Sequence, residues 1–209
     1  MEKTIMRTWF IAALVLIMGT TMACGQEKED VTWLIDVLEL SEGSVVADIG
    51  AGDGSISLAL AEHVGSGGHV YSTELGADSV EYLREMVESA PVSNVTVLEG
   101  HPTQTNLPEG CCDALFLRRV YHHFKDPAAM NESMRQALKP GGRLAVIDFA
   151  PRGDEGGDPA ERATGNHHGV TAETVTRELR EAGFTVISSE QRSGRDVYVV
   201  VRKPNSKNR

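Results

Sequence analysis

The residues with the clearest chemical signature form one glycine-rich segment, Asp48-Ile49-Gly50-Ala51-Gly52-Asp53-Gly54. An apolar run precedes this segment, and the residues that follow it have the composition of a helix. Glycine lets a backbone bend sharply and lets a ligand approach without a Cβ in the way. The segment therefore predicts a strand, a tight turn and a helix N-terminus that together form a nucleotide-binding corner.

A second acid, Glu74, lies at the end of the next predicted strand, 24 residues after Gly50. A carboxylate at this place can accept hydrogen bonds from both hydroxyls of a ribose, as in dinucleotide-binding folds. The alternative for Glu74 is a solvated strand end without a ligand.

Residues suited to proton chemistry follow the fourth predicted strand, at Tyr121, His122 and His123. Imidazole titrates near neutrality, so either histidine could act as a general base, although packing and loop hydrogen bonding are expected for at least one of them. His167 and His168 lie in a later loop that could close over the same pocket. A metal site would need a third ligand that the sequence does not place, so no metal is predicted.

For two further pairs of residues, a structural role is favoured over a functional one. Arg118 and Arg119 could meet an anionic acceptor, but ion pairs on a solvated edge are the favoured interpretation. Cys111 and Cys112 are adjacent, and a bridge between neighbours is strained. Without metal-ligand spacing, both cysteines are predicted to be small, mostly buried groups at the start of a strand.

Alternating strands and helices are predicted to position these residues. Hydrophobic periodicity, glycine turns and helix caps set the expected boundaries. Strands are expected at 44–49, 69–74, 95–99, 114–117, 143–149, 184–189 and 197–202, and helices at 31–40 with Asp30 as N-cap, at 54–63, at 79–89, from Asp126-Pro127 to Gly141-Gly142, and after Thr171. Residues 152–169 are rich in glycine and charge, and predict a long loop of the kind that often forms a lid.

Alternation of this kind forms right-handed βαβ units and a parallel sheet. The last two strands, with no helix between them, must run antiparallel to each other. The chain is therefore predicted to be an α/β protein with a three-layer, Rossmann-like, seven-stranded and mostly parallel sheet that has an antiparallel C-terminal strand. Ligands are expected at the carboxyl ends of the first four strands.

In order and spacing, these motifs resemble those of class I S-adenosylmethionine-dependent methyltransferases, over residues 31–203. The glycine-rich segment looks like the first motif of that family. Asp113-Ala114-Leu115-Phe116 with Tyr121-His122-His123-Phe124 looks like the fourth, and the segment from Leu138 to Leu144 is similar to the turn before the fifth strand. The resemblance implies S-adenosylmethionine as cofactor and in-line transfer of its methyl group to a small-molecule acceptor.

The resemblance also implies roles for single residues. The glycine turn would approach the methionine part of the cofactor. Asp48 would orient that turn, and its negative charge suits a cationic sulfonium. Glu74 would bind the ribose of the cofactor and Leu75 would pack on its adenine. His101 stands where the family usually has an acid, so Glu99, or the backbone at Gly100-His101, would hold the adenine amine. The implied cofactor-binding residues are Asp48, Gly50, Ala51, Gly52, Glu74, Leu75, Glu99, Gly100 and His101, and the catalytic candidates are Tyr121, His122 and His123.

The 209 residues are enough for one domain with a sizeable core, and the formal net charge is −10. Binding to nucleic acid needs clustered Lys and Arg, so an acidic chain of this kind argues against a nucleic-acid partner. Two other functions are alternatives. A nicotinamide-dependent oxidoreductase is disfavoured because Ser55 stands where its fingerprint needs a third glycine. An exported, non-catalytic binding protein on the same fold is the other.

The N-terminus predicts export. Lys3 and Arg7 precede an apolar run of ten residues, Trp9 to Met18, which is short of the ~20 residues that span a bilayer as a helix. The following Thr21-Met22-Ala23-Cys24 resembles a bacterial lipoprotein signal, in which Cys24 is lipidated and tethers the protein to a membrane. Simple cleavage after Ala23 is the alternative.

The predicted parts are thus a signal segment at 1–23, a polar spacer at 24–30, the methyltransferase domain at 31–203 and a polar tail at 204–209. The expected location is exported, either periplasmic or membrane-tethered. It is cytoplasmic if the signal is not used. Export raises a question of supply, because S-adenosylmethionine is made in the cytoplasm.

Overall fold

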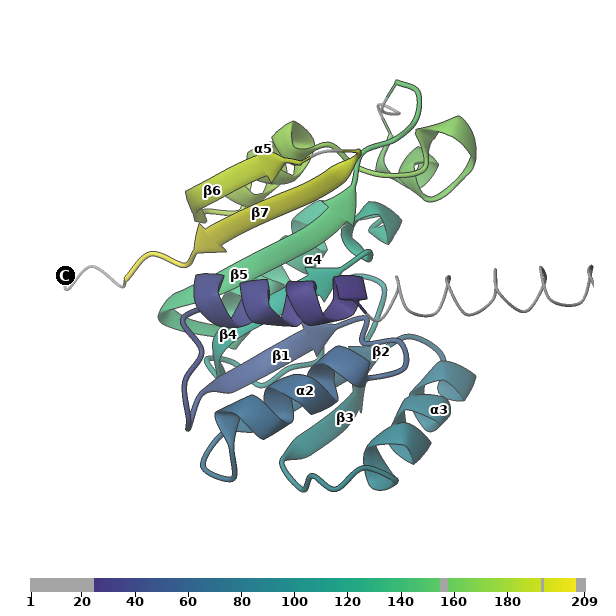
Figure 1. The fold of residues 1–209 in the computed structure, drawn as a ribbon. Helices are drawn as coiled ribbons and strands as arrows, with labels where there is room; N and C mark the ends of the chain where they lie inside the picture. Colours follow the sequence, from purple (N-terminus) through teal and green to yellow (C-terminus); the bar gives the residue numbers. More distant parts are fainter. Residues whose placement is uncertain (1–24, 155–157, 193, 206–209) are drawn as a thin grey trace, which may run out of the picture. The chain divides into compact units, whose positions relative to one another are not determined.

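The computed structural model describes residues 25–154, 158–192 and 194–205 (Figure 1). The predicted signal segment and Cys24 lie outside these residues. The chain divides into a unit that ends at Trp33 and a unit that begins at Leu34, and the sheet belongs to the second unit. Residues 25–37 are helical, so the predicted helix start at Asp30 is wrong. Residues 25–30 are mostly good helix formers, and they extend the helix in the N-terminal direction.

Seven strands form one sheet, as predicted from the alternation of elements. Their order is β3-β2-β1-β4-β5-β7-β6. All neighbours from β3 to β5 pair in parallel, whereas β7 runs antiparallel to both β5 and β6. The strands are β1 (Val45–Ile49), β2 (His69–Glu74), β3 (Val95–Glu99), β4 (Cys112–Arg118), β5 (Leu138–Phe149), β6 (Thr185–Gln191) and β7 (Asp196–Arg202).

Helices cover both faces of the sheet (Figure 1). Because the crossovers reverse direction between β3 and β4, right-handed connections place α2 and α3 on one face and α4 and α5 on the other. The helices are α2 (Ser55–Val64), α3 (Ala77–Glu88), α4 (Pro127–Ala137) and α5 (Ala172–Glu181), with short 3₁₀ turns η1 (Tyr121–His123), η2 (Pro159–Ala163) and η3 (Gly165–His167). Among the described residues, no helix has the length and apolar character needed to cross a membrane.

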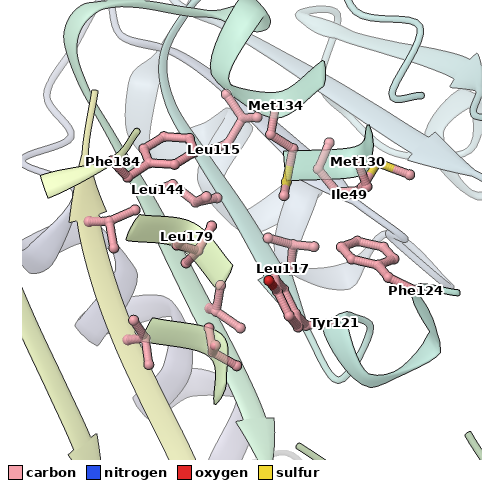
Figure 2. Close-up of a cluster of buried hydrophobic side chains, with 14 of the residues drawn as sticks. Ile49, Leu115, Leu117, Tyr121, Phe124, Met130, Met134, Leu144, Leu179 and Phe184 are labelled. Atoms are coloured by element: carbon pink, nitrogen blue, oxygen red, sulfur yellow. The ribbon is translucent and has the colours of Figure 1, made fainter. Parts of the chain in front are cut away.

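The main core lies between the sheet and the helices α4 and α5. Met130, Met134 and Ala137 recur at helical spacing on α4 and are buried against β4, β5 and α5. Figure 2 shows Met134 beside Leu115 and Leu144 beside Leu179 and Phe184. This packing fixes the carboxyl end of β4, where the candidate catalytic residues follow.

The segment before the predicted fifth strand differs from the expectation. The turn glycines were expected to end α4, but β5 already begins at Leu138, and its register against β4 shifts between Cys112 and Ala114. A Cβ on Gly142 would lie 2.8 Å from the Asp113 carbonyl oxygen. Glycine is needed here because the backbones of a bulged strand pair approach closely.

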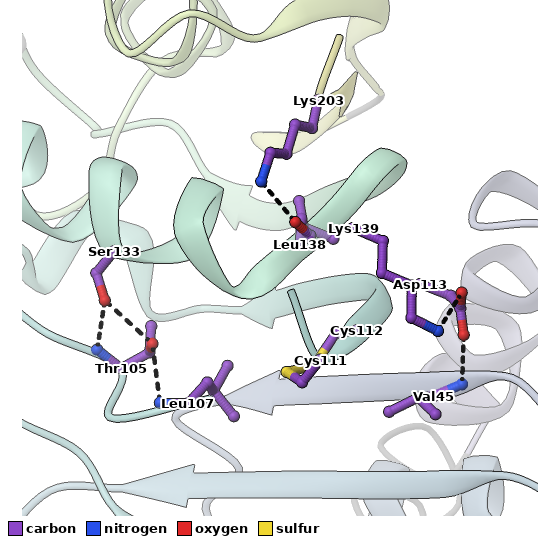
Figure 3. Close-up of a disulfide and its surroundings, with 10 residues drawn as sticks. All are labelled: Val45, Thr105, Leu107, Cys111, Cys112, Asp113, Ser133, Leu138, Lys139 and Lys203. Carbon is purple, nitrogen blue, oxygen red and sulfur yellow. Dashed lines mark hydrogen bonds and ion pairs between the residues drawn. A yellow bond between two sulfur atoms is a disulfide. The ribbon is translucent and has the colours of Figure 1, made fainter. Parts of the chain in front are cut away.

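The two adjacent cysteines form a disulfide, so the prediction of two separate thiols is wrong (Figure 3). Cys111 lies in the turn before β4, whereas Cys112 is the first residue of the strand. Neighbours within a strand point to opposite faces, but a residue in the preceding turn is not held to that alternation. The side chain of Asp113, the next residue, accepts a hydrogen bond from the Val45 backbone N–H at 2.9 Å.

The start of α4 follows the prediction and provides a test of it. The Asp126 side chain accepts a hydrogen bond from the Ala129 N–H at 3.0 Å, and Pro127 occupies the first helical position. Because this bond satisfies a backbone donor that the helix leaves unpaired, Asp126→Ala should lower the free energy of unfolding by about 1 kcal/mol in urea denaturation. Asp126→Asn keeps the capping oxygen and should retain most of the wild-type free energy of unfolding. Equal losses in the two variants would contradict the capping role.

Candidate active site

A cavity of about 320 Å³ opens at the carboxyl ends of the first four strands. This size and position are typical of small-molecule sites in open α/β sheets. The wall combines apolar groups with one carboxylate and two guanidinium groups. The lining residues are Ile49, Gly50, Thr73, Glu74, Leu75, Gly100, His101, Gln104, Thr105, Arg118, Arg119, Val120, His123, Phe124 and Met130.

The glycine-rich turn is fastened to the end of β2. The N–H groups of Gly50 and Ala51 both donate to the Thr73 carbonyl oxygen at 2.9 Å. Gly50 has a φ of 75°, and a Cβ on it would lie 2.6 Å from the Val120 side chain. Glycine is thus required at this position both by conformation and by the close approach of Val120, two residues after β4. Gly50 lines the cavity, whereas Ala51 and Gly52 do not belong to its wall.

Glu74 lines the cavity with a carboxylate held by backbone donors. One of its oxygens accepts from the Gly52 N–H at 2.8 Å and the other from the Leu75 N–H at 2.8 Å. These bonds place a negative charge at the end of β2, as predicted. The Leu75 side chain is about half exposed beside it and gives the wall an apolar surface.

The end of β3 brings the backbone, rather than the predicted acid, to the cavity. Gly100 and His101 belong to its wall, and the Gly100 N–H donates to the Glu74 carbonyl oxygen at 2.9 Å. Glu99 pairs in register with Glu74, but it is exposed and lies outside the lining. Of the two side chains considered for adenine recognition, His101 is therefore the one at the cavity.

Asp48 lies behind the turn and not in the cavity wall. It is buried, and one of its oxygens accepts from the Ser57 hydroxyl at 2.7 Å; the Ser57 oxygen in turn accepts from Ser72 at 2.8 Å. Burial raises the pKa of Asp48 to about 7, against the opposing effect of the Ser57 hydrogen bond. The Ser57 hydroxyl belongs to α2, so Asp48 ties β1 to that helix, whereas the resemblance implied that Asp48 orients the turn.

Tyr121 belongs to the core, although the sequence placed it at the mouth of the pocket. Its hydroxyl donates to Glu178 at 3.0 Å and accepts from the Asn131 amide at 2.8 Å. Burial raises the pKa of Tyr121 well above its ordinary value, so the phenol stays protonated. Figure 2 shows the ring packed beside Leu117. Glu178 also accepts from Arg162 of η2 at 2.7 Å, which connects this network to the long loop.

The structure brings three histidines together beside the cavity: His122, His123 and His168. His123 lines the cavity, and burial lowers its pKa. His122 is buried, with Nδ1 hydrogen-bonded to Asp148 at 2.8 Å, and its Nε2 lies 3.1 Å from Nε2 of His168. The third imidazole that the sequence could not place beside the first two is thus His168, from the predicted loop.

Asp148 is the site residue that sequence reasoning missed. It lies in the apolar run at the end of β5, where an acid among Val146, Ile147 and Phe149 was the available signal. For the two arginines, ion pairs on a solvated edge were the favoured expectation. Arg118 and Arg119 both belong to the cavity wall, because β4 ends at Arg118 and the chain turns there toward η1.

A family model described as a methyltransferase domain matches residues 40–192. The chain belongs to this methyltransferase family. A demethylmenaquinone methyltransferase of Listeria monocytogenes is 28% identical over 124 residues, which are 58% of this chain and 52% of that protein. A protein-L-isoaspartate O-methyltransferase of Methanothrix thermoacetophila is 31% identical over 116 residues, which are 56% and 52% of the two chains.

The methyltransferase chain thus spans about half the length of the curated relatives that it matches. Among solved structures, a SAM-dependent methyltransferase from Aquifex aeolicus is similar, with a TM-score of 0.70 and 26% identity over 83% of this chain and 89% of that one. S-adenosylmethionine is accordingly the cofactor that this methyltransferase family uses.

The environment of Asp48 predicts a pH dependence of stability. Its folded pKa of about 7 lies above the ordinary 3.8, so the fold favours the protonated acid and loses stability as the pH rises from about 4 to 7. Asp48→Asn removes the ionisable group and with it this loss of stability at rising pH. The variant should gain about 2 kcal/mol of unfolding free energy relative to wild type between pH 5 and pH 7. Denaturant titrations at both pH values measure the difference.

The matched control for Asp48 is Glu62→Gln, which changes an exposed acid on α2 whose charge is not among those that shift the pKa of Asp48. It should leave the pH dependence of stability as in wild type. Parallel stability curves for wild type and Asp48→Asn would contradict the elevated pKa of the buried acid.

A second prediction concerns Tyr121. Tyr121→Phe removes a hydroxyl with two buried partners, so the free energy of unfolding should fall by about 1–3 kcal/mol. Binding of S-adenosylhomocysteine, measured by calorimetry below the melting transition, should change less than twofold because Tyr121 does not line the cavity. The exposed Tyr82 offers Tyr82→Phe as control. Lost binding at unchanged stability would instead place Tyr121 in the site.

Proposed function

We propose that this chain is an S-adenosylmethionine-dependent methyltransferase that acts on a small-molecule acceptor by in-line methyl transfer. The observation that carries the proposal is the cavity in which Gly50 and Glu74 meet, at the carboxyl ends of β1 and β2 of a methyltransferase-family fold. A glycine turn and a strand-end carboxylate in this arrangement are suited to the backbone and ribose of a nucleoside cofactor.

The residues of the wall fit S-adenosylmethionine from one end to the other. The Glu74 carboxylate would accept from the ribose hydroxyls, and the exposed face of Leu75 offers an apolar contact for adenine. The backbone of Gly100 and the side chain of His101 lie where the adenine edge would end. Gly50 lets the methionine part pass close to the turn. Ala51 and Gly52 fasten that turn to the end of β2, and Asp48 ties β1 to α2 behind it. Glu99 has no contact with the cavity in this assignment.

The protein has little covalent chemistry to perform. When bound, the cofactor supplies a methyl group activated by a positive sulfur. The chain's part is to align the acceptor behind that methyl group and to keep water out. A base is needed only for an acceptor that must lose a proton, and His123 is the catalytic candidate that lines the cavity. Burial lowers its pKa, so its imidazole is neutral and able to accept a proton near pH 7.

The acceptor side of the cavity favours a small polar molecule with an apolar part. Arg118 and Arg119 contribute positive charge, whereas Phe124 and Met130 contribute apolar surface. The two relatives are named for different acceptors, demethylmenaquinone and protein L-isoaspartate. The wall of this chain and its net charge of −10 agree better with a small molecule, such as a quinone-like ring, than with nucleic acid.

Export and lipidation of Cys24 form a separate part of the proposal, supported by the sequence of residues 1–24. Cell fractionation and N-terminal mass spectrometry of the native protein test it. A mature chain that begins at a lipidated Cys24 in the membrane fraction supports the tether, and a chain with an intact Met1 in the cytoplasm contradicts it. For an exported protein, the alternative function is that of a non-catalytic binding protein on the same fold.

Calorimetry with S-adenosylhomocysteine tests the function. Wild type should bind one molecule, and Glu74→Ala should weaken binding about 10–100-fold because it removes charge-assisted hydrogen bonds to the ribose. The matched control is Glu99→Ala, which removes the register partner of Glu74 outside the cavity and should change affinity less than threefold.

Two results would overturn this function. If wild type does not bind S-adenosylhomocysteine, the enzyme proposal fails. If it binds a nicotinamide dinucleotide instead, the oxidoreductase alternative takes its place. A result in which Glu99→Ala is as damaging as Glu74→Ala would keep the cofactor but move its adenine contact to Glu99.

A further inference from the structure

Three histidine side chains from two distant segments meet beside the cofactor cavity. His122 and His123 belong to η1, directly after β4, and His168 follows η3 in the long loop. One nitrogen of each ring lies within 4.8 Å of the corresponding nitrogens of the other two. This is the one group of its kind in the part of the chain that the structure describes. Imidazole nitrogens in such numbers are the preferred ligands of divalent transition metals.

The buried Asp148 carboxylate fixes which nitrogen of His122 faces the other rings. Its Oδ1 lies 2.8 Å from His122 Nδ1 and also accepts from the Phe149 N–H at 2.9 Å, while Oδ2 accepts from the His122 N–H at 3.2 Å. A carboxylate acceptor keeps a proton on Nδ1, so in the neutral ring the lone pair is on Nε2. Carboxylate–histidine pairs of this kind orient the ligands of metal sites.

His168 is held in place by the end of the same strand. The N–H of Val170 donates to the Phe149 carbonyl oxygen at 2.8 Å, and the Gly169 N–H donates to the Arg162 carbonyl oxygen at 2.9 Å. A Cβ on Gly169 would lie 2.5 Å from the Phe149 carbonyl oxygen, so only glycine allows this close approach. The Phe149 ring packs edge-on against His168, with centroids 5.0 Å apart. β5 therefore positions His122 through Asp148 and His168 through its backbone.

The distances suit coordination with little movement. Two ligands at ~2.05 Å from a tetrahedral ion are ~3.3 Å apart. Nε2 of His122 and Nε2 of His168 are 3.1 Å apart. The centroids of the His123 and His122 rings are 4.0 Å apart, and His123 borders the cavity. A rotation of the exposed His123 side chain toward the other two rings would complete a three-histidine set.

We propose that His122, His123 and His168 bind one divalent transition-metal ion of the Zn²⁺ class beside the acceptor part of the cavity, with Asp148 as the residue that positions His122. Three histidines with an open fourth position are the ligand set of catalytic rather than structural zinc. An ion there would hold an acceptor oxygen, nitrogen or sulfur by its lone pair. This last role rests on the proposed function, whereas the binding of the ion does not. Coordination to the ion would also occupy the lone pair of His123, so His123 would no longer be available as a general base.

Titration of the full chain with Zn²⁺ tests the proposal, on protein purified without a polyhistidine tag and treated with chelator. Calorimetry should give one Zn²⁺ per chain, and Co²⁺ in its place should give the visible absorption of a tetrahedral site. His168→Ala should weaken Zn²⁺ binding at least tenfold and abolish the Co²⁺ band. The matched control is His167→Ala, because the neighbouring His167 lies outside the cluster and contacts the Asp154 carbonyl.

Asp148→Asn tests the positioning role. It should weaken Zn²⁺ binding roughly 10–100-fold and shift the Co²⁺ spectrum, because the His122 ring loses the carboxylate that orients it. Asp148→Glu, which restores the charge, should recover part of the affinity. A purely structural role for Asp148 would lower the melting temperature without a change in the Co²⁺ spectrum of the folded variant.

The outcomes separate this proposal from the proposed function. No stoichiometric Zn²⁺ or Co²⁺ binding by wild type, or equal losses in His167→Ala and His168→Ala, overturns the metal site. S-adenosylhomocysteine binding, measured on the same wild-type sample, decides the function independently. Binding of the nucleoside without metal leaves the methyltransferase proposal intact, and binding of metal without the nucleoside leaves only the metal site.

Discussion

The backbone of the glycine-rich turn is bound to the end of β2, and the candidate site depends on this attachment. Three consecutive N–H groups, from Gly50 to Gly52, donate either to the Thr73 carbonyl oxygen or to the Glu74 carboxylate. A turn rich in glycine has high conformational entropy when unfolded, and these bonds offset part of the loss on folding. They also place the turn and the strand-end acid at a fixed separation, which a cofactor bridging the two would require.

The layer behind the turn is held by a buried polar chain that runs from Ser72 through Ser57 to Asp48. It joins β2, α2 and β1 without using any group that faces the cavity. The acid in this chain is desolvated, and its elevated pKa is the consequence. The layer that supports the glycine-rich turn thus contains a carboxyl group whose ionisation the fold disfavours.

The strength of the local signals explains which features could be predicted. The bounds of β2 and β3 agree with the predicted 69–74 and 95–99, because alternating residues there lie between clear turns. The start of β5 at Leu138 could not be predicted, since it results from a bulge against β4. The helix start at Asp30 was wrong because a local cap pattern competes with helix-forming residues before it.

The same distinction applies to the site. Gly50, Glu74, His101 and His123 could be assigned to the cavity from motif order and strand ends alone. Tyr121 could not, because successive residues of the short turn η1 point in different directions, and the first of them faces the core. Asp148 and His168 lie 26 and 46 residues from His122 along the chain, and only the folding of the chain brings them together. No sequence period relates them.

The reversal of strand order between β1 and β4 divides the cavity into two halves of different origin. Strands β1 to β3 carry the groups suited to the nucleoside, whereas the segments after β4 and β5 carry the arginines and the histidines. The pairing of β1 with β4 joins the halves, and a Cβ on Gly50 would lie 2.6 Å from the Val120 side chain. This is a modular arrangement. A change in the segment after β4 or in the loop after β5 would alter one side of the cavity and leave the groups at the ends of β1 to β3 in place.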